Sequence, residues 1–242
     1  MNSTVATWVA IALLIVAGLA LAYYSMPASP AAAPPAGEQS NPFASGTPAA
    51  LTLAGGTVSL SYPQGVYGLA VAGEPLLAHP YIPPCDSPFD YCIYRVGADY
   101  ASTTFESAGI RISRRADLAS QASCLSTPPA GYANAAPITV TNPSYAAGAF
   151  GPLSDAATGH ESSGTVYPLW AGGSCTEFET RIGESQYANY PPGTIGEFTS
   201  SDRQLVEDEL SAIMGTVAVG STTVAWPAPP AAAPRFPQTG EQ

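Results

Sequence analysis

The hydrophobic residues of this chain follow different patterns before and after residue 25. Thr4 to Tyr24 form a predominantly apolar run that contains no charged side chain. As a helix this run spans roughly 31 Å, which matches a bilayer hydrocarbon core of roughly 30 Å. Trp8 and Tyr23 lie where interfacial aromatic residues are expected. We therefore predict a single N-terminal transmembrane helix, with residues 4–24 in the membrane.

A cleaved signal peptide is the alternative for the same run. Ala20-Leu21-Ala22 is similar to a signal-peptidase site, but the N-terminal MNST lacks Lys and Arg, and the run is long for a signal peptide. These observations favour an anchor over cleavage. The first basic residue is Arg95, so flanking charges do not set the orientation of the helix.

Beyond residue 50 the hydrophobic residues alternate with polar ones, a pattern typical of β-strands. Proline cannot donate a hydrogen bond to a neighbouring strand, so Pro168 favours a sheet-edge position for its strand. The alternation predicts strands over residues 57–62, 68–72, 91–96, 108–113, 138–141, 165–170 and 175–182.

The C-terminal part of the chain contains one predicted soluble helix. Val206, Leu210 and Ile213 follow one another at helical spacing. Ser201 is the expected N-cap, with Gln204 completing a capping box, and a left-handed Gly215 is expected to end the helix. Short strands are predicted over residues 217–219 and 222–226. The predicted fold class is α+β: a mainly antiparallel sheet with one C-terminal amphipathic helix packed on it, preceded by the transmembrane helix.

Segments rich in proline and alanine separate these units. They contain few large apolar side chains, so they cannot bury enough surface to fold. The first is expected to be a semi-stiff spacer, and the last a disordered tail. The predicted order is a transmembrane anchor or signal segment (1–25), a linker (26–50), an extracytoplasmic α+β domain (51–226) and a tail (227–242).

The charge of the chain argues against one class of partner. Seven Lys and Arg residues stand against 18 Asp and Glu, for a net charge of -11. Nucleic-acid binding requires clustered cations, and Arg114-Arg115 is the only adjacent pair in the sequence. We therefore expect no nucleic-acid partner.

Four cysteines follow the apolar run, and an even number in an exported domain predicts two disulfides. Three pairings are possible. We favour Cys85 with Cys92, because the intervening DSPFDY can form a compact loop, and Cys124 with Cys175 by elimination. Zinc sites use short paired spacings that this sequence lacks, so neither a metal nor a cofactor is predicted. The cysteines place the domain outside the cytoplasm.

Residues 165–225 combine an acidic-faced strand, a long loop rich in Tyr, Pro and Gly, an amphipathic helix and a closing strand. This order resembles the C-terminal half of uncharacterised exported bacterial domains, some of them similar to PsbP/Mog1-like α+β domains. The segments PPCDSPFDYC and TTFESAGIRI also look like a family signature. The resemblance implies an α+β fold and transfers no catalytic residue.

Two places in the sequence are candidates for catalysis. Glu177 and Glu179 share one strand face roughly 6.5 to 7 Å apart, a separation compatible with paired glycosidase carboxylates. A solvated, charged strand face explains them better, with Phe178 and Ile182 facing the core instead. His160 lies among serines and glycines, but no nucleophile motif accompanies it, which favours an ordinary loop histidine.

Tyrosines in the predicted loops and strands offer a different kind of site. Tyr91, Tyr94, Tyr187 and Tyr190 are candidate contacts for an envelope protein or a glycan. The leading hypothesis is a membrane-tethered envelope domain that acts as a binding or interaction module. The alternative is a glycan- or peptide-cleaving hydrolase that uses Glu177, Glu179 or His160.

Overall fold

The computed structural model describes residues 46–53, 55–74, 76, 81–129 and 137–228 of the chain. The predicted span at residues 4–24, most of the predicted linker and residues 229–242 of the predicted tail lie outside these ranges. Within the described ranges, no helix has the length and apolar character needed to cross a membrane.

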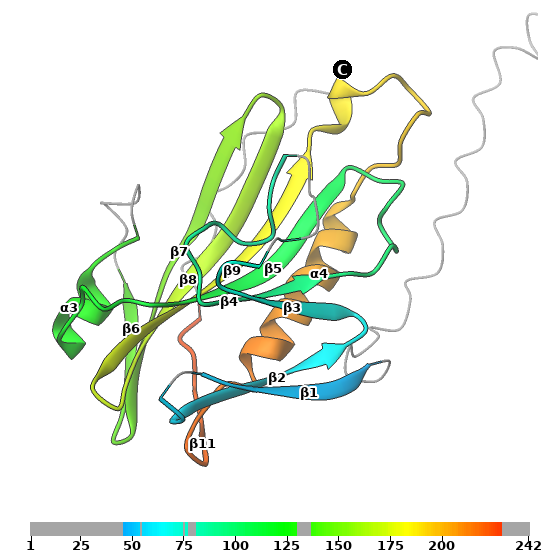
Figure 1. Ribbon diagram of the computed structural model, residues 1–242. Helices are drawn as coiled ribbons and strands as arrows, with labels where there is room; N and C mark the ends of the chain where they lie inside the picture. Colours follow the sequence, from blue (N-terminus) through cyan, green and yellow to red (C-terminus); the bar gives the residue numbers. More distant parts are fainter. Residues whose placement is uncertain (1–45, 54, 75, 77–80, 130–136, 229–242) are drawn as a thin grey trace, which may run out of the picture. The chain divides into compact units, whose positions relative to one another are not determined.

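The described residues form one strongly curved sheet of eleven strands (Figure 1). Its strand order is β11-β10-β2-β3-β4-β5-β9-β8-β7-β6, and β1 pairs with β2 outside this path. Adjacent strands are antiparallel, except that β2 and β3 meet at one parallel contact between Gln64 and Tyr67. The strands are β1 (Thr47–Thr52), β2 (Val58–Gln64), β3 (Tyr67–Val71), β4 (Tyr91–Arg95), β5 (Phe105–Arg114), β6 (Ile138–Asn142), β7 (Tyr145–Ala157), β8 (His160–Ala171), β9 (Ser174–Ser185), β10 (Ala218–Val219) and β11 (Thr222–Thr223).

The predicted α+β class is wrong, because strands dominate the fold. Strand accounts for 48% of the described residues and helix for 14%. The helical segments in the described ranges are α3 (Gln121–Ser126), α4 (Ser200–Met214) and the 3-10 helix η1 (Tyr187–Asn189). Strands β7, β8 and β9 are 13, 12 and 12 residues long. Seven of the 13 residues of β7 are Gly or Ala, which are depleted in strands, so the sequence underestimates the extent of the sheet.

Helix α4 packs its predicted apolar face against the sheet. Val206, Leu210 and Ile213 are buried, as the helical spacing predicts. The predicted N-cap is wrong by two residues: the cap is Thr199, whose hydroxyl accepts the Asp202 N–H at 3.2 Å. The Asp202 carboxylate accepts the Thr199 N–H in return, so Asp202 completes the capping box and not Gln204, two residues later. The C-cap Gly215 is right-handed, with φ -62°, and not left-handed as predicted.

Strands β5 and β9 are buried on both faces, which the sequence does not predict. On one face Ile110 and Phe178 join the main core beneath α4. The other face is covered by the connection between β3 and β4. A Cβ added at Gly109 would lie 2.9 Å from the Pro84 carbonyl oxygen, and one added at Gly183 would lie 2.5 Å from Cγ2 of Ile82. The connection therefore rests directly on the backbone of the sheet.

Two disulfides each fasten a segment outside the sheet to one of its strands, and both favoured pairings are confirmed. Cys85 and Cys92 join the β3–β4 connection to β4, with 6.1 Å between their Cα atoms. Cys124 and Cys175 join α3 to β9, with 5.6 Å between their Cα atoms. Disulfides of this kind form in oxidising compartments, so the domain is extracytoplasmic.

Strand β8 lies inside the sheet, between β7 and β9, so the edge position predicted from Pro168 is wrong. Pro168 pairs with Glu177 of β9, and the β7–β8 register, in which Ala147 pairs with Leu169, puts Pro168 opposite Gly148. A Cβ on Gly148 would lie 3.1 Å from Cγ of Pro168. A glycine neighbour leaves room for the proline ring, which allows proline within the sheet.

Candidate functional site

An open groove with a volume of about 420 Å³ lies at one end of several neighbouring strands. Strands β1, β3 and β5 end there, and β4 and β9 begin there. Ligand pockets of small molecules begin at roughly 300 Å³, so the groove has the size of a binding site. The sheet opens here because β2 touches β3 only at Gln64 and Tyr67. The groove is lined by Leu53, Val71, Ala72, Asp90, Tyr91, Ile112, Arg114 and Thr176.

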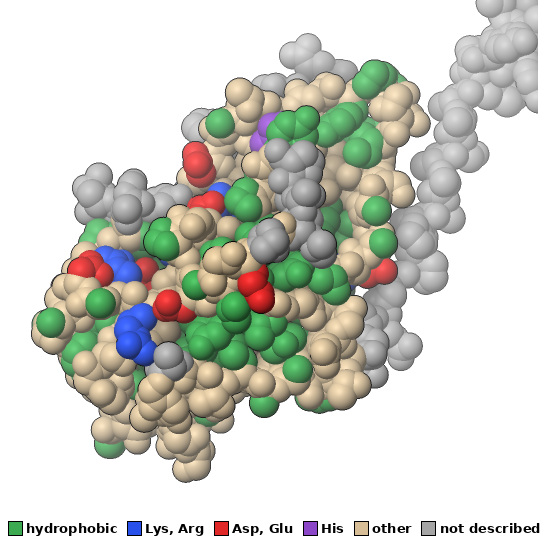
Figure 2. Space-filling model, viewed as in Figure 1, with side chains coloured by type: hydrophobic (Ala, Val, Ile, Leu, Met, Phe, Trp, Pro, Cys, Tyr) green, Lys and Arg blue, Asp and Glu red, His purple; other side chains and the backbone are tan. Residues whose placement is uncertain are grey.

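The wall of this groove is apolar and its rim is polar. Val71, Tyr91 and Ile112 lie side by side because they are paired across β3, β4 and β5. At the rim the Asp90 carboxylate accepts the backbone N–H of Arg114 at 2.6 Å. Figure 2 shows hydrophobic side chains gathered around β3, with acidic and basic side chains beside them. An apolar wall with a few fixed polar groups is the usual composition of a ligand site.

Glu177 and Glu179 do not line the groove. The sequence predicts a solvated position for Glu177, and this prediction is wrong because the side chain is buried. Glu177 is only 2% exposed. Its carboxylate accepts a hydrogen bond from Arg115 at 2.5 Å and lies 3.9 Å from Arg111. Arg111 in turn contacts Glu179 at 2.6 Å. Burial raises the pKa of Glu177 above its ordinary value, while Arg115 and Arg111 act in the opposite direction.

Arg181 does not pair with Glu179, although it follows it on the same strand face. It contacts Asp86 of the β3–β4 connection and donates a hydrogen bond to Ser162 at 3.2 Å. The acidic face of β9 is therefore part of a network of ion pairs under the second layer. The pairs of Arg111 and Arg115 with Glu177 and Glu179 join β5 to β9, and the pair of Arg181 with Asp86 joins β9 to the β3–β4 connection.

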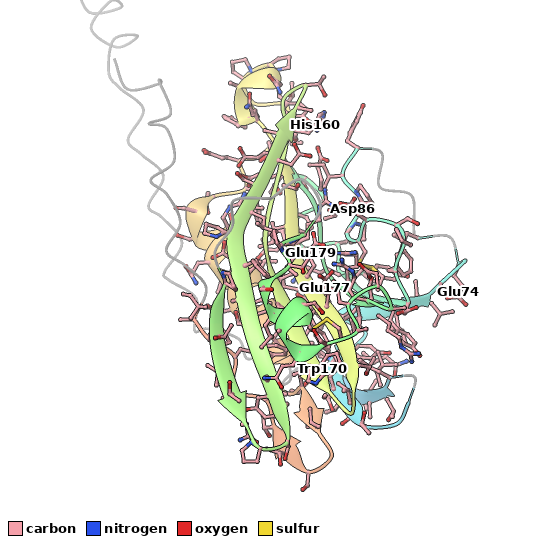
Figure 3. The ribbon with its side chains drawn as sticks, turned by 90° about the vertical axis from the view of Figure 1, so that its left-hand side faces the viewer. Glu74, Asp86, His160, Trp170, Glu177 and Glu179 are labelled. Carbon is pink, nitrogen blue, oxygen red and sulfur yellow. A yellow bond between two sulfur atoms is a disulfide. The ribbon has the colours of Figure 1, made fainter. Side chains whose placement is uncertain are left out.

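His160 lies far from the two glutamates, near one end of the sheet (Figure 3). Glu177 pairs with Pro168, eight positions along β8 from His160, and at roughly 3.3 Å per residue this corresponds to roughly 26 Å. The Nδ1 atom of His160 contacts the Glu106 carboxylate, and Tyr81 stacks on the ring with 4.3 Å between centroids. A carboxylate at Nδ1 orients an imidazole, as in histidine bases.

The serines near His160 have other partners. Ser162 accepts a hydrogen bond from Arg181, and Ser163 accepts one from Arg203 at 2.8 Å. Neither hydroxyl is therefore placed as a nucleophile beside the histidine. No group of three or more His, Cys, Asp or Glu side chains that could hold a metal ion occurs in the part of the chain that the structure describes.

The four candidate tyrosines do not form one site. Tyr91 lines the groove and packs against the main core. Tyr94, three positions along the same strand, packs against the cluster around Cys85 and Cys92. Tyr187 is 41% exposed on η1, and the Tyr190 hydroxyl shares a hydrogen bond with Ser185 at 2.9 Å. Only Tyr91 contributes to the groove.

The structure brings together a second pair of carboxylates, which the sequence does not predict. Glu161 of β8 lies directly opposite Glu184 of β9, and Arg203 of α4 contacts both. Burial raises the pKa of Glu184 to about 7, and its hydrogen bond with Glu161 acts in the same direction, while Arg203 opposes it. The two glutamates are distant in the sequence, and only the strand register brings them together.

This pair predicts that the stability of the domain depends on pH. A pKa of about 7, against the ordinary value of 4.5, means that the folded state binds a proton at Glu184 more tightly than the unfolded chain does. The stabilisation is present below pH 4.5 and is lost as the pH rises through 7. We expect a loss of about 2 kcal/mol over this interval, with allowance for partial exposure of the carboxyl group.

The measurement is urea unfolding followed by circular dichroism between pH 4 and pH 8. Glu184→Gln should flatten the profile across this interval, whereas Glu207→Gln, at an exposed position of α4, should leave it unchanged. A wild-type profile that rises steadily from pH 4 to pH 8 would contradict the assignment.

Comparison of the chain with protein-family models, with curated proteins and with solved structures finds no match. The resemblance to PsbP/Mog1-like domains stays a prediction, and the function is argued from the site itself.

Proposed function

We propose that this chain is a membrane-tethered extracytoplasmic binding module whose ligand occupies the groove at Tyr91. The observation that carries the proposal is the groove itself, with its volume of about 420 Å³, its apolar wall and its polar rim. The paired strands hold Val71, Tyr91 and Ile112 in fixed positions, so the site is formed before the ligand arrives. A preformed apolar groove favours an apolar or aromatic ligand group, with Asp90 and Arg114 at its rim.

The ion-pair network supports binding over hydrolysis by Glu177 and Glu179. A glycosidase needs one carboxyl group that gives a proton to the substrate and another that reaches the substrate or a water molecule. Here Arg115 and Arg111 hold the two carboxylates at 2.5 and 2.6 Å, and neither glutamate lines the groove. The geometry therefore favours a structural role for both side chains.

The predicted anchor would hold this module at the membrane. Residues 25–46 separate the proposed span from β1, which begins at Thr47. In an extended polyproline conformation these residues would reach up to roughly 70 Å. Fractionation of cells tests the proposal: the intact chain should stay in the membrane pellet after carbonate extraction. Recovery of a soluble chain that begins after Ala22 would show cleavage and would remove the anchor.

Binding in the groove is tested with 1-anilinonaphthalene-8-sulfonate, a fluorescent apolar anion. Val71→Glu introduces a negative charge into the apolar wall, and we expect the dissociation constant of the dye to rise about tenfold. Val96→Glu is the matched control, since Val71 and Val96 are 38% and 40% exposed and only Val71 lines the groove. Equal affinity in the wild type and both variants would count against the groove as the binding site.

A further inference from the structure

Strand β6 forms one edge of the sheet among the residues that the structure describes. It is the last strand in the sheet order, and within the described ranges it pairs only with β7. Exposed edge strands are usually protected from pairing by charged residues, proline or bulges. The sequence of β6, ITVTN, contains neither charge nor proline, and its register with β7 is regular. The β1 strand, in contrast, contains Pro48.

The register shows which main-chain groups of β6 point outward. Asn142 pairs with Tyr145 across a two-residue turn, so Asn142 and Val140 direct their N–H and C=O groups toward β7. The alternating residues Thr139 and Thr141 direct theirs away from the sheet. Both threonines are exposed, and Ile138 at the start of the strand is 45% exposed. This edge therefore offers two donors and two acceptors beside an exposed apolar side chain.

The charge distribution indicates which partner can approach this edge. The chain carries a net charge of -11, yet no charged residue occurs between Asp117 and Asp155. The uncharged stretch includes α3, β6 and the first part of β7. Two copies of an acidic protein repel each other over most of their surfaces, and the repulsion is least where an uncharged surface meets its own copy. The β6 edge combines this neutral surface with main-chain groups that face no other strand in the described ranges.

We propose that β6 pairs with β6 of a second copy of this chain, in antiparallel orientation about a two-fold axis at Val140. This register places Thr139 of each copy opposite Thr141 of the other copy. Each of these two pairs exchanges two main-chain hydrogen bonds, which gives four in total. The contact is isologous, as expected for a symmetric dimer, and it joins the two sheets into one. It does not involve the groove, so it goes beyond the proposed binding function.

A cysteine substitution in the full-length chain tests the register. In this arrangement Val140 faces its own copy as a non-hydrogen-bonded pair, for which the Cα atoms lie about 4.5 Å apart. That distance is within the range of a disulfide. The four native cysteines are already paired. Val140→Cys should therefore give a cross-linked species of twice 24.7 kDa on a non-reducing gel.

Ala50→Cys is the matched control, because Ala50 is an exposed residue of the edge strand β1. Cross-linking of V140C at least about tenfold above A50C is the expected result. Equal cross-linking of the two variants, or none in either, overturns the proposed register. If β6 instead accepts an extended peptide from another protein, the purified chain does not cross-link at Val140, which also overturns the proposal.

Sedimentation of the full-length chain in detergent measures the same contact without a covalent bond. T139E/T141E places glutamates directly opposite each other across the proposed axis, so the dissociation constant of the dimer should rise about tenfold or more. Residues 4–24 are identical in the wild type and this variant, so the difference reports on β6. Circular dichroism confirms that both fold alike. A wild type that sediments as a monomer at all concentrations, or a variant that dimerises equally, refutes the contact.

Discussion

Replacing Cys124 and Cys175 with alanine is expected to lower the free energy of unfolding by about 4 kcal/mol. The bond closes a loop with a sequence separation of 51 residues, so its removal greatly increases the conformational freedom of the unfolded chain. Both sulfur atoms are also buried, in a small cluster with Leu118 and Trp170 that fastens α3 to β9. Because small domains are stable by only about 5 to 15 kcal/mol, the loss is a large share of the total.

The second disulfide supplies the control. Cys85 and Cys92 are separated by 7 residues, so the same chain-entropy argument gives only about 2.5 kcal/mol for their double alanine variant. Urea unfolding of the wild type and both variants measures the free energy that each bond contributes. The comparison uses the midpoint of unfolding and the slope of the free energy against urea concentration. Equal losses in the two variants would show that loop length does not control the contribution of these bonds.

Glu177→Gln is expected to destabilise the domain by about 3 kcal/mol. The substitution keeps the size of the side chain but removes the charge that faces Arg115 at 2.5 Å and Arg111 at 3.9 Å. Glu177 is 3% exposed as a side chain, so water cannot replace the lost partner of the arginines. The free energy of unfolding falls because the positive charges of Arg115 and Arg111 lose a buried carboxylate partner.

Glu179→Gln is the matched control on the same strand. Its side chain is 18% exposed and, within the described part of the chain, forms its ion pair with Arg111, so we expect a loss of about 1 kcal/mol. Thermal and urea unfolding near neutral pH distinguish the two variants. If Glu177→Gln were as stable as the wild type, the ion pairs of Glu177 with Arg115 and Arg111 would have no role in stabilising the domain.

The sequence predicts the parts of this fold that depend on local pattern. Alternation identifies β2, β4 and β9 close to their observed positions, and Phe178 and Ile182 are buried as expected. The Cys85–Cys92 pairing follows from the short loop between them. These features are set within a few residues of chain, where side-chain periodicity and loop length act directly.

Apart from the Cys124–Cys175 pairing, which follows by elimination, features that depend on distant contacts were not predicted. Glu177 lies on a polar strand face by its sequence, but the connection between β3 and β4 covers that face and buries it. Of the residues that line the groove, the sequence identifies Tyr91 as a candidate binding residue. Leu53, Val71 and Arg114 come from other parts of the chain, and the pairing of the strands brings them to the groove. Strand β7 has the composition of a loop and is stabilised by its neighbours on both sides. Local propensity carries no information about such neighbours.

Gly109 and Gly183 restrict sequence change more tightly than the hydrophobic core does. A core position accepts several apolar residues of similar volume, whereas these two positions have no room for a side chain of any kind. Substitution by alanine would force the β3–β4 connection away from the sheet and admit water to the ion pairs beneath it. Chains that share this architecture should therefore have glycines at the corresponding positions of β5 and β9, together with cysteines that correspond to positions 85, 92 and 175. We expect this combination even where the remaining sequence has diverged.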